Sequence, residues 1–346
     1  MESQIQQQQQ NPQFWDPTGK LPNLTQLEQN NIVIRDKSRY WRENFSKINQ
    51  IFYSIYVSSF ILFSILIIFS QAFELFIAFF FIYFVIIAIF YSVLHSKLKS
   101  LKKDLVKLEL AEHKNWLYES EKSLELYRKY YTFFPEIFNL GEKYQNIEDI
   151  FWGNITRNSV NHSFVSGLFN YTYTVTQRTK NSTRRRDVHC CDHFFILKLP
   201  KTISSRFYLF PKNLMNKFTN MFTKKNIQTE SLEFNKRFSF SYQQNGSEVQ
   251  IDIMTILSPR VIEELVNFSK SKEKNMFSGH GSLINGLEVL FTQNCVIFLT
   301  PGPLLKKLQV SISPKSLEIS QEEVAEVEKL MNFYIDISTE ISKYLN

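Results

Sequence analysis

Cysteine is scarce in this chain, and charge is missing from one long stretch of it. Three cysteines occur in 346 residues, at positions 190, 191 and 295. They form no even set of spaced pairs, which excludes a small secreted scaffold held together by disulfides. We expect the three thiols to stay reduced in a cytosolic compartment, so the fold needs no disulfide.

The stretch without charge decides the class of protein. Residues 48–94 contain a single charged side chain, Glu74. The run divides at residues 70–74 into two apolar stretches, 51–69 and 75–94, each close to the ~20 residues that a helix needs to cross a bilayer. A soluble helix of this length would carry a polar stripe, and these carry none. The sequence predicts a two-helix transmembrane hairpin. It is not a cleaved signal peptide, because about fifty residues precede it.

Basic residues on both sides of the hairpin predict its orientation. The connecting loop carries only Glu74, and positively charged flanks stay on the cytoplasmic side of a membrane. Both termini are therefore expected in the cytoplasm, where several Asn-x-Ser/Thr triplets, among them those at 154, 161, 170, 181 and 245, would not be glycosylated. The flanking residues are Arg35, Lys37, Arg39, Arg42 and Lys47 before the first stretch, and Lys97, Lys99, Lys102, Lys103 and Lys107 after the second.

Composition sets the remaining boundaries. The N-terminus contains a glutamine tract and several prolines, which is typical of a disordered tail. The second apolar stretch continues without glycine or proline into a charged helical pattern. The expected organisation is a tail over residues 1–31, a basic entry segment over 32–50, the hairpin over 51–94, a long helix or stalk over 95–134, a cytosolic α+β domain with antiparallel strands over 135–318, and a C-terminal amphipathic helix over 319–346.

Leucines in the stalk repeat at alternating spacings of four and three residues. This is the seam of a coiled coil, which would dimerise the protein. Glu112 interrupts the pattern after about two heptads, so the other interpretation, a helix that packs its leucines on its own domain, is favoured. The residues concerned are Leu94, Leu98, Leu101, Leu105 and Leu108.

Beyond residue 135 the apolar pattern changes from a period of 3.6 residues to a period of two, which indicates strands. Ser258-Pro259 has the cap and first residue of a helix, and Ser320 with Glu323 has the spacing of a capping box. The expected strands are 171–176 and 188–199, joined by a basic turn over 178–187, then 206–210, 238–242 and 249–257, and a hairpin of 286–292 with 295–300.

The order of these pieces carries a resemblance to a known family. The phrases Ser231-Leu232-Glu233-Phe234-Asn235-Lys236-Arg237-Phe238 and Ile256-Leu257-Ser258-Pro259-Arg260-Val261-Ile262 follow a two-span hairpin and a long helix. Over about residues 30–305 the chain resembles the bacterial membrane family catalogued as domain of unknown function 3137. The resemblance implies this architecture and a bacterial inner membrane. It implies no activity, cofactor or catalytic residue.

The densest set of reactive side chains is Val188-His189-Cys190-Cys191-Asp192-His193. On a strand, His189, Cys191 and His193 would share one face, and with a donor from a neighbouring strand they could hold zinc. Adjacent residues cannot close a tetrahedron alone, so an ordinary strand is favoured and neither a metal nor a cofactor is expected. The rival is a membrane-bound enzyme, metal-dependent or not, with a site near His189, Cys191 and His193; convergence of these three with His280 or an acid in a pocket would favour it.

Positive charge is concentrated in residues 171–237, where 14 Lys and Arg face four acids. Near a cytoplasmic leaflet such a patch suits anionic lipid head groups or an acidic protein. Nucleic acid is a weaker alternative, because the nearby aromatic residues are more commonly used in a core. The sequence thus favours a membrane-anchored, non-catalytic binding or scaffold module. The basic residues at the expected turn are Arg178, Lys180, Arg184, Arg185 and Arg186.

Overall fold

The protein is α+β, with an antiparallel sheet and one described segment, Phe81–Lys114, long and apolar enough to cross a membrane. The chain divides into a helical unit, residues 24–110 with 307–325, and a sheet unit made of the rest. The computed structural model describes residues 14–19, 21–69, 73–157, 160–179, 182–203, 206–212, 223–224, 229–242, 253–273, 286–302 and 321–344.

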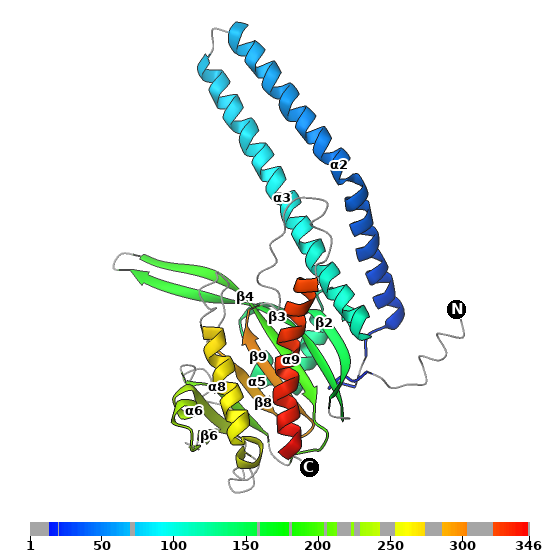
Figure 1. Ribbon diagram of the computed structural model, residues 1–346. Helices are drawn as coiled ribbons and strands as arrows, with labels where there is room; N and C mark the ends of the chain where they lie inside the picture. Colours follow the sequence, from blue (N-terminus) through cyan, green and yellow to red (C-terminus); the bar gives the residue numbers. More distant parts are fainter. Residues whose placement is uncertain are drawn as a thin grey trace, which may run out of the picture. The chain divides into compact units, whose positions relative to one another are not determined.

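Two long helices make up most of the helical unit, α2 (Leu24–Phe69) and α3 (Phe73–Lys114). They run antiparallel, since the ring centroids of Phe52 and Phe90 are 4.7 Å apart and those of Tyr56 and Phe84 are 6.0 Å apart (Figure 1). α2 begins at Leu24, inside the tail expected over residues 1–31. It can begin there because no proline or glycine after Pro22 interrupts it. Residues 24–31 are therefore helical, where the sequence predicted disorder.

The stalk helix expected over residues 95–134 ends at Lys114. Asn115 adopts the left-handed conformation with φ 56°, and the amide of Trp116 donates to the carbonyl oxygen of Ala111 at 2.7 Å. This is a Schellman ending, which asparagine tolerates better than most residues. Two short helices, α4 (Leu124–Phe133) and α5 (Pro135–Phe138), replace the second half of the stalk.

The stalk leucines are largely enclosed within the single chain. Four of the five predicted positions are buried, and Leu94 is half-buried. Self-association through them stays a prediction. The four buried residues are Leu98, Leu101, Leu105 and Leu108.

Within the described residues the sheet has nine strands in the order β1-β2-β3-β4-β9-β8-β5-β7-β6, and all neighbouring strands are antiparallel. The first four strands form a meander, and β9 joins them to the remaining strands. The bounds are β1 Leu117–Glu119, β2 Lys143–Arg157, β3 Val160–Thr179, β4 Ser182–Lys198, β5 Phe207–Pro211, β6 Thr223–Lys224, β7 Phe238–Tyr242, β8 Glu288–Phe291 and β9 Cys295–Pro301.

Helices cover both faces of the sheet. On one face, Tyr130 of α4 and Phe138 of α5 pack on Phe194 of β4, with ring centroids 5.8 and 5.4 Å away. On the other lie α8 (Pro259–Glu273) and α9 (Gln321–Tyr344), side by side in Figure 1. Tyr334 of α9 stacks on Phe195 at 4.9 Å. The aromatic residues of the strands therefore lie in the core.

Part of the expected tail is bound to the sheet unit. Asp16 is 5% exposed, and its Oδ2 accepts hydrogen bonds from the Tyr130 hydroxyl at 2.6 Å and from Trp152 Nε1 at 3.0 Å. Its Oδ1 accepts from the backbone amide of Thr18 at 2.8 Å. Composition did not reveal this contact, because a single acidic residue in a polar segment carries no periodic signal.

Three strand predictions need correction. The basic segment expected as a turn lies mostly inside β4, so β3 and β4 are longer than predicted. A strand was expected over residues 249–257, but residues 253–256 are helical. Residues 249–252 lie outside the described part of the chain. β1 and β2 were missed. In β2, Tyr144 and Asp149 have positive φ values of 54° and 56°, and its pairing with β3 shifts twice, so apolar residues do not alternate regularly.

Candidate functional site

The first candidate site is a two-stranded ribbon that projects beyond the sheet. Pairing of β3 with β2 ends at Thr172, and pairing of β4 with β9 ends at His193. Among the described residues, 173–179 of β3 and 182–188 of β4 pair only with each other. We call these two segments the basic ribbon; they are the long green arm in Figure 1.

Three consecutive arginines give the basic ribbon its charge. Arg184, Arg185 and Arg186 are exposed and lie opposite Gln177, Thr176 and Val175 in the strand register. Successive side chains on a strand point to opposite faces, so Arg184 and Arg186 share one face while Arg185 lies on the other. Both faces of the ribbon are therefore basic. Of the other residues predicted for this site, Arg178 pairs with Thr183 through its backbone and Lys180 lies outside the described residues.

The acid in the basic ribbon is already matched. Asp187 accepts a hydrogen bond from the Thr174 hydroxyl at 2.9 Å and lies 3.5 Å from Lys143 Nζ. These contacts, the Thr174 hydrogen bond first, lower the pKa of Asp187. The carboxylate thus stays ionised and paired at the base of the ribbon, and the arginine charges farther out have no acid opposite them in the register.

The three predicted metal candidates occupy alternate positions of β4, opposite Thr172, Asn170 and Leu168. Their surroundings differ: His189 is exposed, Cys191 is half-buried and His193 is 1% exposed. His189 Nδ1 lies 2.7 Å from the Thr172 hydroxyl. Within the described part of the chain, no three His, Cys, Asp or Glu side chains gather closely enough to hold a metal ion. His280, the fourth residue of the enzyme alternative, lies outside it.

His193 takes part in a buried network instead. Its Nε2 lies 2.8 Å from Ser166 Oγ, and its Nδ1 lies 3.2 Å from the Tyr334 hydroxyl. That hydroxyl is also 3.0 Å from Thr300 Oγ1. A serine beside a histidine has the composition of a nucleophile and its base. All four residues are at most 1% exposed, so a substrate has no access to Ser166. The network connects α9 to the sheet.

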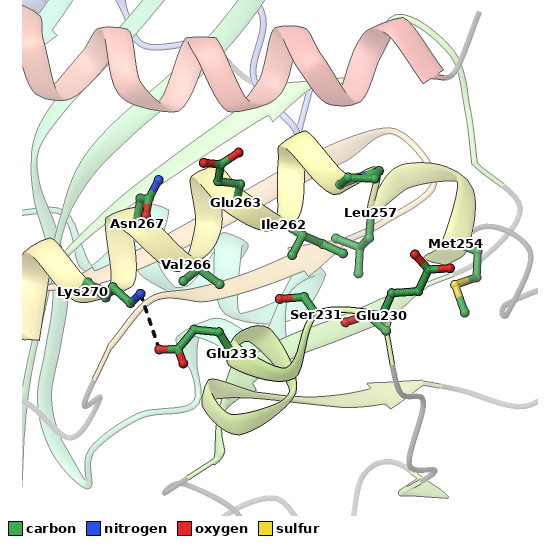
Figure 2. Close-up of a pocket in the computed structure, with 12 residues that line it drawn as sticks. Glu230, Ser231, Glu233, Met254, Leu257, Ile262, Glu263, Val266, Asn267 and Lys270 are labelled. Atoms are coloured by element: carbon green, nitrogen blue, oxygen red, sulfur yellow. Dashed lines mark ion pairs between the residues drawn. The ribbon is translucent and has the colours of Figure 1, made fainter.

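The second candidate site is a cavity of about 580 Å³ between α8 and the short helix α6 (Leu232–Arg237). Figure 2 shows the two helices on opposite sides of it. Its apolar lining comes mainly from one side of α8 and from the turn before that helix. The apolar residues are Met254, Leu257, Pro259, Ile262 and Val266, and the polar ones are Thr229, Glu230, Ser231, Glu233, Glu263, Asn267 and Lys270.

Local hydrogen bonds fix both walls of this cavity. Asn235 Oδ1 accepts from the amide and the hydroxyl of Thr229, both at 3.0 Å, and Asn235 Nδ2 donates to the Thr229 carbonyl oxygen at 2.7 Å. Ser231 caps α6 by accepting from the amide of Phe234. Ser258 caps α8 by accepting from the amide of Val261. The backbone of Glu230 is thus fixed on both sides, by the hydrogen bonds between Asn235 and Thr229 before it and by the Ser231 cap of α6 after it.

The cavity carries an excess of negative charge. Glu233 Oε1 lies 3.0 Å from Arg237 Nε and 3.5 Å from Lys270 Nζ. The Arg237 hydrogen bond, followed by the charge of Lys270, lowers the pKa of Glu233. Glu230 and Glu263 are both exposed and form no hydrogen bond or ion pair within the described residues. Within the described part of the chain, the ammonium of Lys270 therefore has an acidic partner, while the carboxylates of Glu230 and Glu263 have no basic one.

Sequence reasoning identified the arginines but neither the buried network nor the cavity. Ser166, His193 and Tyr334 come from three distant segments and carry no motif. Residues of the cavity lie partly in the phrases that resemble the bacterial family, yet nothing in their spacing showed that α6 and α8 would face each other.

Comparisons with known proteins add no family. No family model matches the chain, and no curated protein matches it. Among solved structures, the crystal structure of the mycobacterial trehalose monomycolate transport factor A superposes with a TM-score of 0.31 and 8% identity, over 67% of this chain and 91% of that one. The similarity to the family catalogued as domain of unknown function 3137 stays a prediction.

Proposed function

We propose that this chain is a two-pass membrane protein whose cytosolic α+β domain is a non-catalytic binding module, and that the basic ribbon binds anionic lipid head groups. The projecting pair of strands with three exposed arginines carries the proposal. Three further observations support it: the exposure of the apolar helices, the position of the flanking lysines and arginines, and the absence of access to the serine and histidine pair.

The apolar residues of α2 and α3 face outwards. The most apolar 18 residues of the segment Phe81–Lys114 are only 11% buried, whereas the core helix of a soluble protein would be mostly buried. In α2, Ile61 is 52% and Leu62 is 59% exposed, and in α3, Ile86 is 59% exposed. A hydrocarbon environment would cover these side chains. This supports a second crossing by residues 51–69 of α2 beside the crossing by α3.

The charge pattern supports a cytosolic sheet unit. Because α2 and α3 run antiparallel, the basic first half of α2 and the basic second half of α3 lie at the same end of the pair. Positively charged ends stay in the cytoplasm. The sheet unit follows the basic end of α3 directly, so it would lie near the cytoplasmic leaflet. There, each well-placed arginine contributes about 1 kcal/mol of attraction to anionic lipid.

Reporter fusions test the topology. A reporter that works only in the cytoplasm should be active when it is fused after Asn346, and inactive when it is inserted within residues 71–73. A reporter that works only outside the cytoplasm should give the opposite pair of results. An externally active reporter at the C-terminus would overturn the two-pass arrangement and would place the basic ribbon away from the anionic leaflet.

Lipid contact is tested with the full chain in liposomes. A polarity-sensitive fluorophore on Thr183→Cys, in a Cys191→Ser background, lies in the basic ribbon at an exposed position. Its emission should shift in liposomes containing phosphatidylglycerol but not in pure phosphatidylcholine. The shift should decrease as added salt shortens the ~10 Å screening length found at 0.1 M.

Two triple variants, one in the basic ribbon and one elsewhere as its matched control, test whether the arginines bind the lipid. Arg184→Gln, Arg185→Gln and Arg186→Gln together should abolish the fluorescence shift. Lys201→Gln, Lys236→Gln and Lys329→Gln change the net charge equally at exposed positions and should leave it intact. Equal shifts in both lipids, or an equal effect of both triple variants, would contradict lipid binding. Binding of an acidic peptide or of single-stranded nucleic acid without any lipid response would assign the ribbon to that partner.

A further inference from the structure

We propose that the cavity between α6 and α8 binds a small organic cation, a primary ammonium or guanidinium group carried on an apolar chain. This inference is independent of the proposed function, because it uses none of the arginines of the basic ribbon. It follows from the size of the cavity, from its apolar wall and from the carboxylates that have no ion-pair partner among the described residues.

The size and lining suit a small molecule. A volume of about 580 Å³ lies within the range of ~300–1,000 Å³ that is typical of ligand pockets. Leu257, Ile262 and Val266 form an apolar wall, and each of them is at most 9% exposed. Met254 lies at the edge and is 52% exposed. Its flexible thioether side chain can adapt to an apolar chain that enters beside it.

The charges select a cation. Three of the four ionisable residues that line the cavity are glutamates and the fourth is Lys270. Lys270 lies 3.5 Å from Glu233, which it shares with Arg237 at 3.0 Å. In Figure 2 the carboxylate of Glu230 lies next to Met254 and Leu257, whereas Glu233 points towards Lys270. A bound anion would meet the unmatched charge of Glu230. A bound ammonium would donate a charge-assisted hydrogen bond to this carboxylate, which is stronger than a bond between neutral groups.

Glu230 is also held ready for such a contact. The three hydrogen bonds between Asn235 and Thr229 fix the residue before it, and the cap on α6 fixes the residue after it. Binding therefore orders little additional backbone, which reduces the entropic cost of association. Glu263 points to the side of α8 away from α6 in Figure 2, so it adds negative potential at the edge without contacting the ammonium directly.

The experiment uses dansylcadaverine, a fluorescent molecule with a primary amine on a five-carbon chain. The full chain is placed in phosphatidylcholine nanodiscs, and the signal from empty nanodiscs is subtracted. Binding should be saturable, and the analogue that carries a hydroxyl in place of the amine should bind about tenfold or more weakly, since it lacks the charge that pairs with Glu230.

Variants locate the probe. Glu230→Gln should weaken the amine about tenfold, and Glu230→Lys should abolish its binding. Met254→Trp should also reduce binding by filling the edge of the cavity, without any change of charge. Glu264→Gln removes a carboxylate of α8 that does not line the cavity, and this variant should bind the amine as the unchanged protein does.

Two results would overturn the inference: equal binding of the amine and the hydroxyl analogue, or unchanged amine binding by Glu230→Lys. Because Glu230 is exposed, its substitution should leave the melting temperature unchanged, and that measurement separates lost binding from lost folding. The triple arginine variant should bind the probe normally. If only the lipid experiment fails, the cation site in the cavity still stands. If only the amine experiment fails, lipid binding by the basic ribbon still stands.

Discussion

His193 and Tyr334 are 141 positions apart in the sequence, and 3.2 Å separates His193 Nδ1 from the Tyr334 hydroxyl oxygen. The same hydroxyl lies 3.0 Å from Thr300 Oγ1, and the tyrosine ring stacks on Phe195. Tyr334 thus contacts both β4 and β9 at the place where these strands pair. A single residue of α9 therefore connects that helix to two strands of the sheet.

Removing the Tyr334 hydroxyl should destabilise the protein. Tyr334→Phe keeps the stacking on Phe195 but leaves buried groups of His193 and Thr300 without this partner, at a cost of about 1–3 kcal/mol. We expect a lower melting temperature for the full chain in detergent. Tyr144→Phe is the control, because that residue is 72% exposed and should melt unchanged. Identical melting of both variants would show that the hydroxyl contributes nothing.

Asp16→Ala should release the N-terminal segment from the sheet unit. The variant leaves the buried Tyr130 hydroxyl and Trp152 indole N–H without their acceptor, which should cost about 3 kcal/mol or more. Burial, followed by the charge of Asp16, holds the pKa of Tyr130 well above its usual value, so the tyrosine stays a donor at all moderate pH values. Melting and limited proteolysis before residue 24 measure the effect. Asp36→Ala, at an exposed position, should change neither.

The three thiols should differ in reactivity. Cys190 and Cys295 are buried, and Cys191 is half-buried. Burial raises the pKa of Cys295 to about 11, so at about pH 8 its thiol is almost wholly protonated and unreactive. Native protein treated with iodoacetamide should be alkylated first at Cys191, and Cys191→Ser should remove this fast phase. Mass spectrometry identifies the site, and rapid labelling of Cys295 would show that β9 is more accessible than the structure indicates.

His162 should make the protein less stable in acid. Burial lowers its pKa from the ordinary value of 6.5. As pH falls through about 6.5, the unfolded chain takes up a proton at this site while the folded chain does not, so folding is disfavoured. Between about pH 7.5 and 5.5 the melting temperature should fall less in His162→Gln than in the unchanged protein.

The histidine and cysteine positions of β4 should not hold stoichiometric zinc. His193 is enclosed by Ser166 and Tyr334, and turning it towards His189 would break both contacts. Elemental analysis of the purified full chain should find zinc below one ion per chain, unchanged by Cys191→Ser. Zinc at one ion per chain that is lost on this substitution would restore the metal interpretation.

Local signals predicted several elements correctly. The strand expected over residues 238–242 has these bounds as β7, and the helix expected after Ser258 begins at Pro259 as α8, with the serine as its cap. The hairpin of β8 and β9 is also present. In each case the information lies in neighbouring residues: alternation of apolar side chains in the strands, and a cap followed by proline in the helix.

Elements whose conformation depends on distant partners were not predictable in this way. The left-handed Asn115 ends α3 where the charged helical pattern continues. β2 contains two residues with positive φ and two shifts of register, which only its pairing with β3 makes visible. The cavity forms only because α6 and α8 face each other. The two helices are more than twenty residues apart in the sequence, and they share no motif that would predict this contact.

The junction of β4 and β9 has a consequence for the order of folding. The meander from β1 to β4 can form as soon as residue 198 has been synthesised, but its partner strand begins only at Cys295. Until then, Phe194, Ile196 and their neighbours lie along an open edge of the growing sheet, although they are fully buried in the finished protein. Such long-range pairing is slow to form. A chain truncated before β9 would retain an apolar edge that recruits other strands, so we expect it to aggregate.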